Sequence, residues 1–73
     1  MDNLLCQFGL HYGGEEVWCK TAMKETCYQL FFNCRYVAEL VMDENMEWVL
    51  ASGVVLPVEV INHIGQRIER KYL

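Results

Sequence analysis

The most constraining feature of this sequence is the segment from residue 26 to residue 51, TCYQLFFNCRYVAELVMDENMEWVLA. It contains three runs rich in β-branched and aromatic residues, 26–32, 36–42 and 46–51. The triplets NCR and DEN between them have the composition of turns. The segment therefore predicts three antiparallel strands joined by two hairpin turns.

If both triplets are three-residue loops, the loop length fixes which residues of the three runs lie opposite each other. Since side chains alternate between the two sides of a sheet, the pairing also fixes which residues share a side. Leu40 then faces Trp48 in one hairpin and Tyr28 in the other. In this register one side of the sheet carries Tyr28, Leu30, Phe32, Tyr36, Ala38, Leu40, Met42, Met46, Trp48 and Leu50. A shift of one residue would turn a whole run over, so the agreement between the hairpins supports this predicted inner face.

The C-terminal segment LPVEVINHIGQRIERKYL has the periodicity of an amphipathic helix. Its apolar stripe, at steps of three, three, four and four, consists of Val58, Ile61, Ile64, Ile68 and Tyr72. Pro57 suits the first turn, where its missing N–H costs nothing, so we expect a helix over residues 57–72 on the predicted inner face. Gly65 lies beside the stripe, where a missing side chain lets a helix approach a sheet closely.

The first third of the chain predicts another hairpin. Two runs, 4–10 and 15–22, surround the glycine pair of CQFGLHYGGEEVWC. A turn around Tyr12 and Gly13, or a four-residue loop over 11–14, places Cys6 opposite Cys19 in either case. With a further turn near residues 24 and 25, residues 1–73 form a single α+β domain: an antiparallel meander of about five strands with one C-terminal helix packed on one face.

The opposite side of the predicted sheet is unusually apolar. It carries Cys27, Gln29, Phe31, Val37, Glu39, Val41, Glu47, Val49 and Ala51. A sheet face exposed to water usually alternates to polar residues more cleanly. We therefore interpret this side as a surface for a protein partner or a second copy of the chain, with Phe31, Val37, Val41 and Val49 as the candidate partner-binding residues.

Composition and charge restrict the function classes. The 73 residues are 53% hydrophobic, which is typical of a folded chain, and ten acidic against six basic side chains give a net charge of −4. Such a charge repels phosphate backbones. The one local basic cluster, Arg67, Arg70 and Lys71, suits the C-terminal end of a helix dipole. A nucleic-acid-binding regulator that uses the sheet and this cluster is therefore the alternative hypothesis.

The residue types that carry catalysis or bind metals are poorly placed for either. The four cysteines are separated by 12, 7 and 6 residues, whereas structural zinc sites use closely spaced pairs. No histidine is predicted near a cysteine, Cys34 lies in a turn without an activating base, and the acidic residues after position 42 suit a hairpin turn. We predict no enzymatic activity, no cofactor and no metal.

No apolar stretch reaches the roughly 18 residues of a membrane span, and the start, MDNLLCQFGL, lacks the basic residues of a signal peptide. A cytoplasmic protein is predicted, without a membrane partner. Opposed strand residues are close enough to form a disulfide, with Cα atoms roughly 4.5–5.5 Å apart. In a reducing cytoplasm we expect Cys6 and Cys19 to stay reduced and to pack as small apolar side chains.

The segment AELVMDENMEWVLASGVVLPVEVINHIGQRIE resembles the ending of certain small uncharacterised bacterial proteins. In these a strand that contains Trp is followed by a helix of the pattern LPxExIxxIGxxIE. The resemblance covers less than half of the chain, and the family has no assigned activity, so it implies the fold and no function. The leading hypothesis is a non-enzymatic interaction module or small accessory subunit, acting as a homodimer through the apolar side of the sheet.

Overall fold

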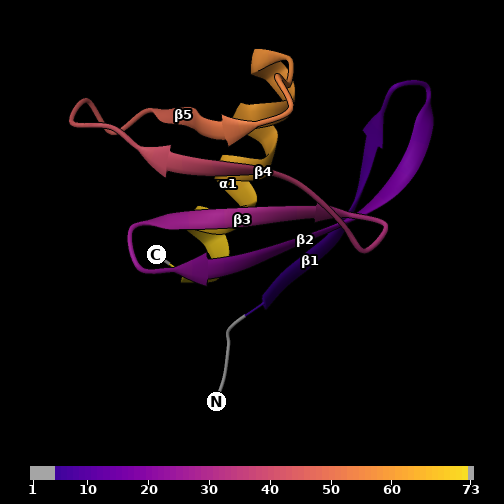
Figure 1. The fold of residues 1–73 in the computed structure, drawn as a ribbon, viewed down its shortest axis with the longest axis horizontal. Coiled ribbons are helices and arrows are strands. Elements are labelled where there is room, and N and C mark those ends of the chain that lie inside the picture. The colour runs from indigo at the N-terminus through magenta and orange to yellow at the C-terminus, as the bar shows by residue number, and fades with distance from the viewer. Residues whose placement is uncertain (1–4, 73) are drawn as a thin grey trace.

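The computed structural model describes residues 5–72 and contains five strands and one helix (Figure 1). The elements are β1 (Leu5–Tyr12), β2 (Glu15–Lys24), β3 (Cys27–Phe32), β4 (Arg35–Met42), β5 (Trp48–Gly53) and α1 (Val58–Tyr72). The strands form one antiparallel sheet in the order β1-β2-β3-β4-β5, so each pairs with its neighbour in sequence. The predicted meander with a C-terminal helix is confirmed. Position 4, the predicted start of the first strand, lies outside the described residues.

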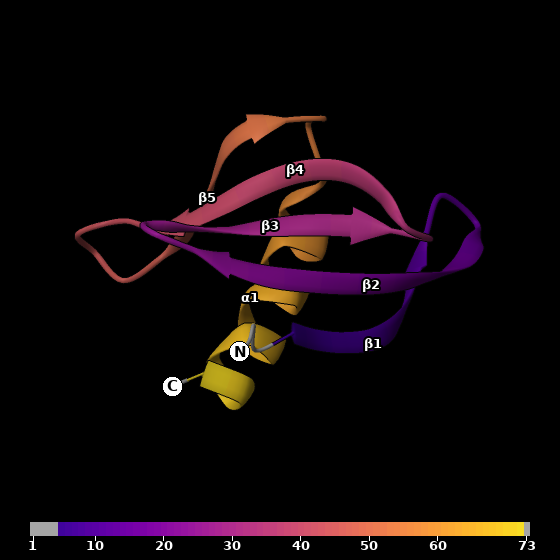
Figure 2. The ribbon, with the colours of Figure 1, turned by 60° about the horizontal axis from the view of Figure 1, so that its bottom comes forward.

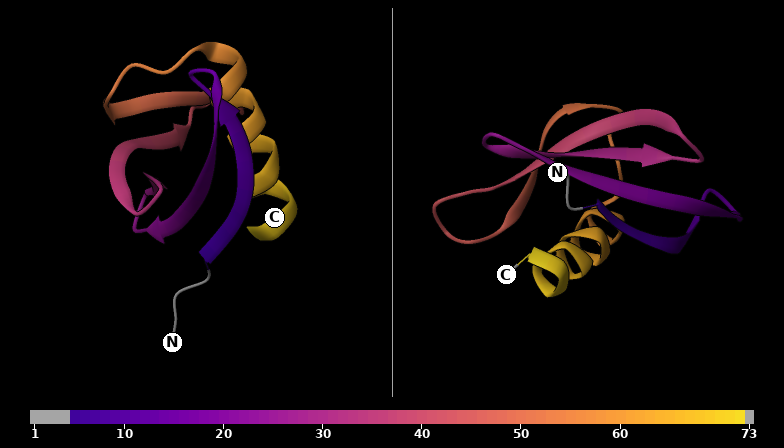
Figure 3. Two further views of the ribbon diagram at one scale, coloured as in Figure 1. Left: turned by 90° about the vertical axis from the view of Figure 1, so that its right-hand side faces the viewer. Right: turned by 90° about the horizontal axis from the view of Figure 1, so that it is seen from below.

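The sheet is bent, and α1 lies on its concave side (Figures 2 and 3). Two bulges contribute to the bend, because an extra residue in one strand increases its twist. Val37 is the extra residue in β4, and Ala51 is the extra residue in β5. Both edge strands, β1 and β5, contact α1.

The core lies between the concave side of the sheet and the helix. Leu30, Leu40, Ile64 and Ile68 are fully buried there. Gly65 confirms the expected close approach of helix and sheet, because a Cβ atom at this position would lie 2.2 Å from Cδ1 of Trp48. The indole Nε1 of Trp48 donates a hydrogen bond of 2.8 Å to Oε2 of Glu69, which fixes the ring against the helix.

The helix begins one residue later than predicted, and the start of its apolar stripe is wrong. The carbonyl of Pro57 accepts the first bonds, from the N–H groups of Val60 and Ile61. Val58 is 66% exposed, whereas Leu56, just before the helix, is buried and fills the end of the core. The first turn of α1 therefore contributes less to the core than its periodicity indicates. The side chain of Tyr72, at the other end of the stripe, lies outside the described part.

The register of the first hairpin differs from the predicted one by two residues. Gly13 and Gly14 form a two-residue turn with φ values of 63° and 79°. Two adjacent residues with positive φ are the requirement of a type I′ hairpin turn, which glycine satisfies without strain. As a result Cys6 lies opposite Thr21 and Cys19 opposite Phe8, so the predicted Cys6–Cys19 pairing is wrong. Because the shift is even, both cysteines still face the core, where they are buried.

The other turns also differ from the predicted three-residue loops. Asn33 and Cys34, with φ values of 51° and 72°, form a two-residue turn, and the bulge that follows places Tyr36 opposite Phe31. Tyr36 is consequently 48% exposed on the convex side of the sheet. Residues 43–47 form a longer loop that carries Met46 away from the core, 73% exposed. The predicted inward positions of Tyr36 and Met46 are therefore wrong.

Candidate functional site

The candidate site is the convex side of the sheet, which we call the outer face. Within residues 5–72 no helix or strand covers it, because α1 lies on the other side (Figure 3). Its principal side chains are Trp18, Lys20, Gln29, Phe31, Tyr36, Glu39, Val41 and Val49. Trp18 and Tyr36 are each about half exposed, which is unusual for such large apolar groups.

One end of the outer face is aromatic. The rings of Phe31 and Tyr36 meet edge to face, with centroids 5.9 Å apart and an interplanar angle of 73°. Lys20 lies opposite Phe31 on the neighbouring strand. Trp18 is two residues before Lys20 on β2, so its side chain points to the same side of the sheet. The four side chains together make an exposed aromatic surface with one positive charge.

Trp18 is held in place by hydrogen bonds at both its backbone and its ring. Its N–H donates to Oδ1 of Asn33 over 2.9 Å, and its carbonyl accepts from the N–H of Asn33 over 2.8 Å. Its indole Nε1 donates to Oε1 of Gln7 over 3.1 Å. An exposed indole that is already ordered loses less conformational entropy when a partner covers it.

The other end of the outer face is aliphatic. Val41 and Val49 lie opposite each other on β4 and β5, and Val49 is 37% exposed. Between this pair and the aromatic end, Nε2 of Gln29 donates to Oε2 of Glu39 over 3.5 Å. The outer face therefore combines two apolar areas with a polar pair between them, and its charged side chains include Lys20, Lys24 and Glu39.

The structure places three of the four predicted partner-binding residues on this face. Phe31, Val41 and Val49 lie there, whereas Val37 is the extra residue of the β4 bulge and packs against the buried cluster. Tyr36 could not be placed on this face from the sequence, because the bulge that turns it outward leaves no mark in the alternation of residue types. The glycine pair could have predicted a two-residue turn at Gly13 and Gly14. That turn fixes the register of β1 and β2 and places Trp18 opposite Gly9.

The cysteines have the properties of structural residues. All four are free thiols; Cys6, Cys19 and Cys27 are buried, and Cys34 is exposed at the tip of the β3–β4 turn. Burial, with a smaller contribution from neighbouring Cys6, raises the pKa of Cys19 to about 12. Burial also raises the pKa of Cys27, and its hydrogen bond with Glu39 adds to this effect. At neutral pH both thiols are protonated, which makes them poor nucleophiles and poor metal ligands.

The two histidines contact Glu16 and Phe8. Nδ1 of His11 is 3.6 Å from Oε2 of Glu16, and both side chains are largely exposed. The ring of His63 packs edge to face on Phe8, with centroids 5.9 Å apart. Within the part of the chain that the structure describes, no three side chains of His, Cys, Asp or Glu come close enough together to hold a metal ion.

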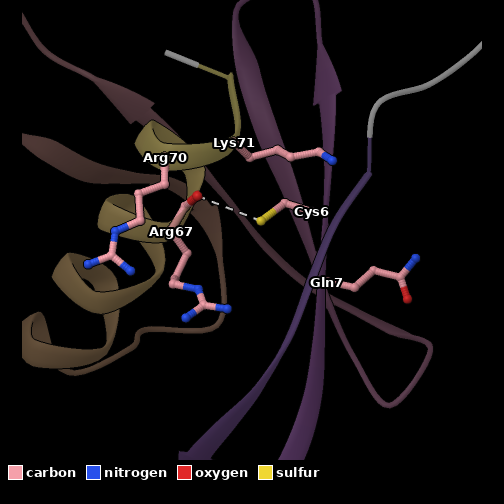
Figure 4. A pocket seen from close by; sticks show the side chains of 5 residues that line it. All are labelled: Cys6, Gln7, Arg67, Arg70 and Lys71. Carbon is pink, nitrogen blue, oxygen red and sulfur yellow. Dashed lines mark hydrogen bonds between the residues drawn. The ribbon is translucent and has the colours of Figure 1, made fainter.

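The basic cluster of the alternative hypothesis lies on α1. Arg67, Arg70 and Lys71 line a hollow of about 350 Å³ together with Cys6 and Gln7 of β1 (Figure 4). This hollow is beside the helix, whereas the aromatic residues of the outer face lie on the other side of the sheet. The cations therefore lie on the helix side of the sheet and the aromatic rings on the outer face, and Gln7 at the edge of β1 lines the hollow while its Oε1 accepts from the indole of Trp18.

The chain matches no family model, no curated protein and no solved structure. The resemblance to small uncharacterised bacterial proteins therefore stays a prediction. Of the residues described, α1 is the only helix, and its 15 residues are neither long nor apolar enough to cross a membrane.

Proposed function

We propose that this chain is a non-enzymatic protein-interaction module, and that its outer face binds a second copy of the chain. The observation that carries the proposal is the group of Trp18, Phe31 and Tyr36 on a side of the sheet that no described element covers. Aromatic side chains bring a large apolar area into an interface and are enriched among the residues that dominate binding energy.

The arrangement of charges supports a homodimer. In a twofold dimer the same surface meets itself, so each charged residue needs an opposite charge on the same face. Lys20 at the aromatic end and Glu39 nearer the aliphatic end supply such a pair. With the two faces antiparallel, Lys20 of one copy meets Glu39 of the other, and the aromatic end of each copy covers the aliphatic end of its partner.

The same features make nucleic acid a weaker proposal. The chain has a net charge of −4, and its basic cluster does not lie on the side that carries the exposed aromatic rings. A protein partner needs no excess of positive charge and uses the apolar outer face directly.

Size-exclusion chromatography with light scattering tests the proposal. We expect the wild-type chain to have the mass of a dimer, and Tyr36→Lys and Val41→Lys to shift it to a monomer while far-UV circular dichroism stays unchanged. Val55→Lys is the matched control, because Val55 is 81% exposed in the connection between β5 and α1. A wild-type chain that is monomeric at its highest soluble concentration would show that the homodimer is wrong. An unfolded Val41→Lys variant would show that the outer face has been assigned incorrectly.

A further inference from the structure

We infer that the groove between the free edge of β1 and the helix α1 binds an extended acidic peptide. The peptide adds to the sheet as a sixth strand, antiparallel to β1, with its carboxyl-terminal end beside Arg67, Arg70 and Lys71. This site goes beyond the proposed dimerisation, because it uses a different surface and a different chemistry from the outer face.

The backbone of β1 has free hydrogen-bonding groups. β1 is the first strand of the sheet, and no described strand lies beyond it. A two-residue turn makes Tyr12 and Glu15 a hydrogen-bonded pair, and bonded pairs alternate with non-bonded ones along an antiparallel ladder. The N–H and C=O groups of Gln7, Gly9 and His11 therefore point to the free edge.

The contacts of Trp18 agree with this alternation. Trp18 is the partner of Gly9, and its own N–H and C=O groups are directed away from β1, to Asn33. Three residues at alternate positions of β1 thus offer up to six backbone hydrogen bonds in an orientation that an added strand can use.

The edge of β1 lacks the features that usually prevent strand addition. Natural edge strands are often short, bulged, or protected by lysine or proline. β1 has eight residues, LCQFGLHY, with no proline, no lysine and an unshifted register to β2. The other edge strand, β5, has six residues and a bulge at Ala51. Of the two edges, β1 is the better template for an added strand.

The helix forms the second wall of the groove and leaves space at both ends. One hollow, of about 350 Å³, lies between Cys6 and Gln7 and the last turns of α1. The second, of about 320 Å³, is lined by Leu10 and His11 of β1 and by Glu59, Val60 and His63 of α1. Both hollows are open to solvent, so the side chains of an added strand have room beside the helix.

The middle of the groove has an apolar floor. Phe8 lies between the two hollows and is only 3% exposed. The guanidinium of Arg67 covers its ring, with Cζ 4.8 Å from the ring centroid, and His63 packs against it at 5.9 Å. These two side chains cover Phe8, and each also lines one of the two hollows.

Charge sets the direction and the composition of the peptide. Arg67, Arg70 and Lys71 lie at the end of the groove next to the start of β1, and Figure 4 shows Arg67 and Lys71 on either side of Cys6. Among residues 5–72 no carboxylate lies within ion-pair distance of these three cations. The helix dipole accounts for cations in the last turn, but it does not account for an open strand edge beside them.

Glu59 lies at the opposite end of the groove, so the groove is positive at one end and negative at the other. An antiparallel strand runs from the Glu59 end to the basic end. Its terminal carboxylate and acidic side chains then meet the three cations.

A phage-displayed library of heptapeptides with free carboxyl termini, selected on the full chain, supplies the probe. We expect enrichment of Asp and Glu in the last positions and alternating residues before them. A fluorescein-labelled peptide from the selection is then titrated by fluorescence anisotropy. We expect amidation of its carboxyl terminus to weaken binding about tenfold, since it removes one charge from the basic hollow. A selection that enriches no acidic peptide overturns the proposal.

Substitutions at Gly9 test whether the peptide pairs with the strand edge. Gly9→Pro removes an N–H at the free edge, where proline is tolerated in a strand, whereas Gly9→Ala keeps it. A Cβ atom at this position would lie 3.7 Å from the Oε1 atom of Glu16, which is ordinary van der Waals contact, so the alanine side chain fits. We expect Gly9→Pro to weaken binding about tenfold or more and Gly9→Ala to leave it unchanged. Equal affinity of the two variants contradicts strand addition.

Two further measurements separate this site from the outer face. The double substitution Arg70→Glu and Lys71→Glu is expected to abolish detectable binding, whereas Arg35→Glu, at the start of β4, and Tyr36→Lys are expected to leave it unchanged. Hydrogen exchange followed by NMR gives a readout on wild-type protein: the amides of Gln7, Gly9 and His11 exchange rapidly in the free chain and slowly with peptide bound. Slow exchange of these amides in peptide-free protein, with a dimeric mass, means that a second copy occupies the edge and overturns the proposal.

Discussion

The two sides of the sheet are built from similar residue types but differ in what lies against them. On the inner side Leu30, Leu40, Ile64 and Ile68 are fully buried, and Trp48 fits against a glycine. On the outer face Phe31 and Val41 are only half-buried, and two large aromatic residues are exposed. The difference teaches that hydrophobicity alone does not identify the core of this chain: contact with α1 determines which side is buried and which side stays exposed.

The strongest test of the inner side is Gly65→Ala. The added Cβ would lie 2.2 Å from the indole ring of Trp48, so the helix and the sheet must separate. We expect the free energy of unfolding to fall by about 3 kcal/mol or more, measured by urea denaturation. Gly9→Ala is the control, because it adds the same atom where there is room, and its stability should change by less than about 1 kcal/mol. A stable Gly65→Ala variant would contradict the close packing of α1 on Trp48.

Substitutions at two adjacent residues of β4 allow the two sides of the sheet to be compared by their effect on stability. Leu40 is fully buried on the inner side, and Val41 is half-buried on the outer face. Leu40→Ala should lower the free energy of unfolding by about 3 kcal/mol, because it leaves a cavity in the core. Val41→Ala should cost less than about 1 kcal/mol in the monomer and weaken self-association. Urea denaturation at low protein concentration measures the first effect and light scattering the second, and equal losses of stability would contradict the assignment of sides.

Alkaline pH should lower the free energy of unfolding through the buried thiol of Cys19. The folded chain holds the thiol proton up to a pKa of about 12, whereas the unfolded chain releases it near the ordinary value of 9.0. The contribution of Cys19 to stability is therefore fully present below about pH 9 and falls as the pH rises from 9 to 12. The slope is up to about 1.4 kcal/mol per pH unit. Urea titrations across this range should show a steeper decline for wild type than for Cys19→Ala; parallel curves would contradict the shift.

Thiol reactivity is expected to involve no change in stability, but it reports which of the four cysteines are accessible to solvent. Cys34 is exposed in the β3–β4 turn, whereas Cys6, Cys19 and Cys27 are buried. A disulfide reagent such as Ellman's should therefore modify one thiol per chain rapidly in the native state and all four after denaturation. Cys34→Ser should remove the rapid phase without a change in stability. Rapid modification of Cys6 or Cys19 in the native wild type, located by peptide mass spectrometry, would show that the inner side is open.

The strands, the helix and the topology were predictable from the sequence, because period-two and helical patterns survive small errors of register. The predicted pairing of Cys6 with Cys19 was displaced by two residues, and an even displacement leaves every side chain on its own side of the sheet. The positions of Tyr36 and Met46 were wrong for a different reason. They depend on a bulge and on a five-residue loop, which the hydrogen bonds from Asn45 and Glu47 to Asp43 stabilise.

The candidate site was predictable to the same extent. Phe31, Val41 and Val49 follow from alternation, whereas the exposure of Tyr36 requires the bulge in β4. The groove beside β1 depends on where α1 crosses the sheet, and periodicity in one helix does not give a crossing position. Side-chain patterns thus predicted which residues share a face, and tertiary packing decided which backbone edge stays open.

The two tryptophans of this chain lie on opposite sides of the sheet, and this makes the protein its own fluorescent reporter. Trp48 is buried against Gly65 and bonded to Glu69, so its emission should be blue-shifted and protected from iodide. Trp18 is 47% exposed, so iodide should quench it until a partner covers the outer face. Trp48→Phe and Trp18→Phe each leave one signal, and unfolding and association can then be recorded separately in the same sample without an added label.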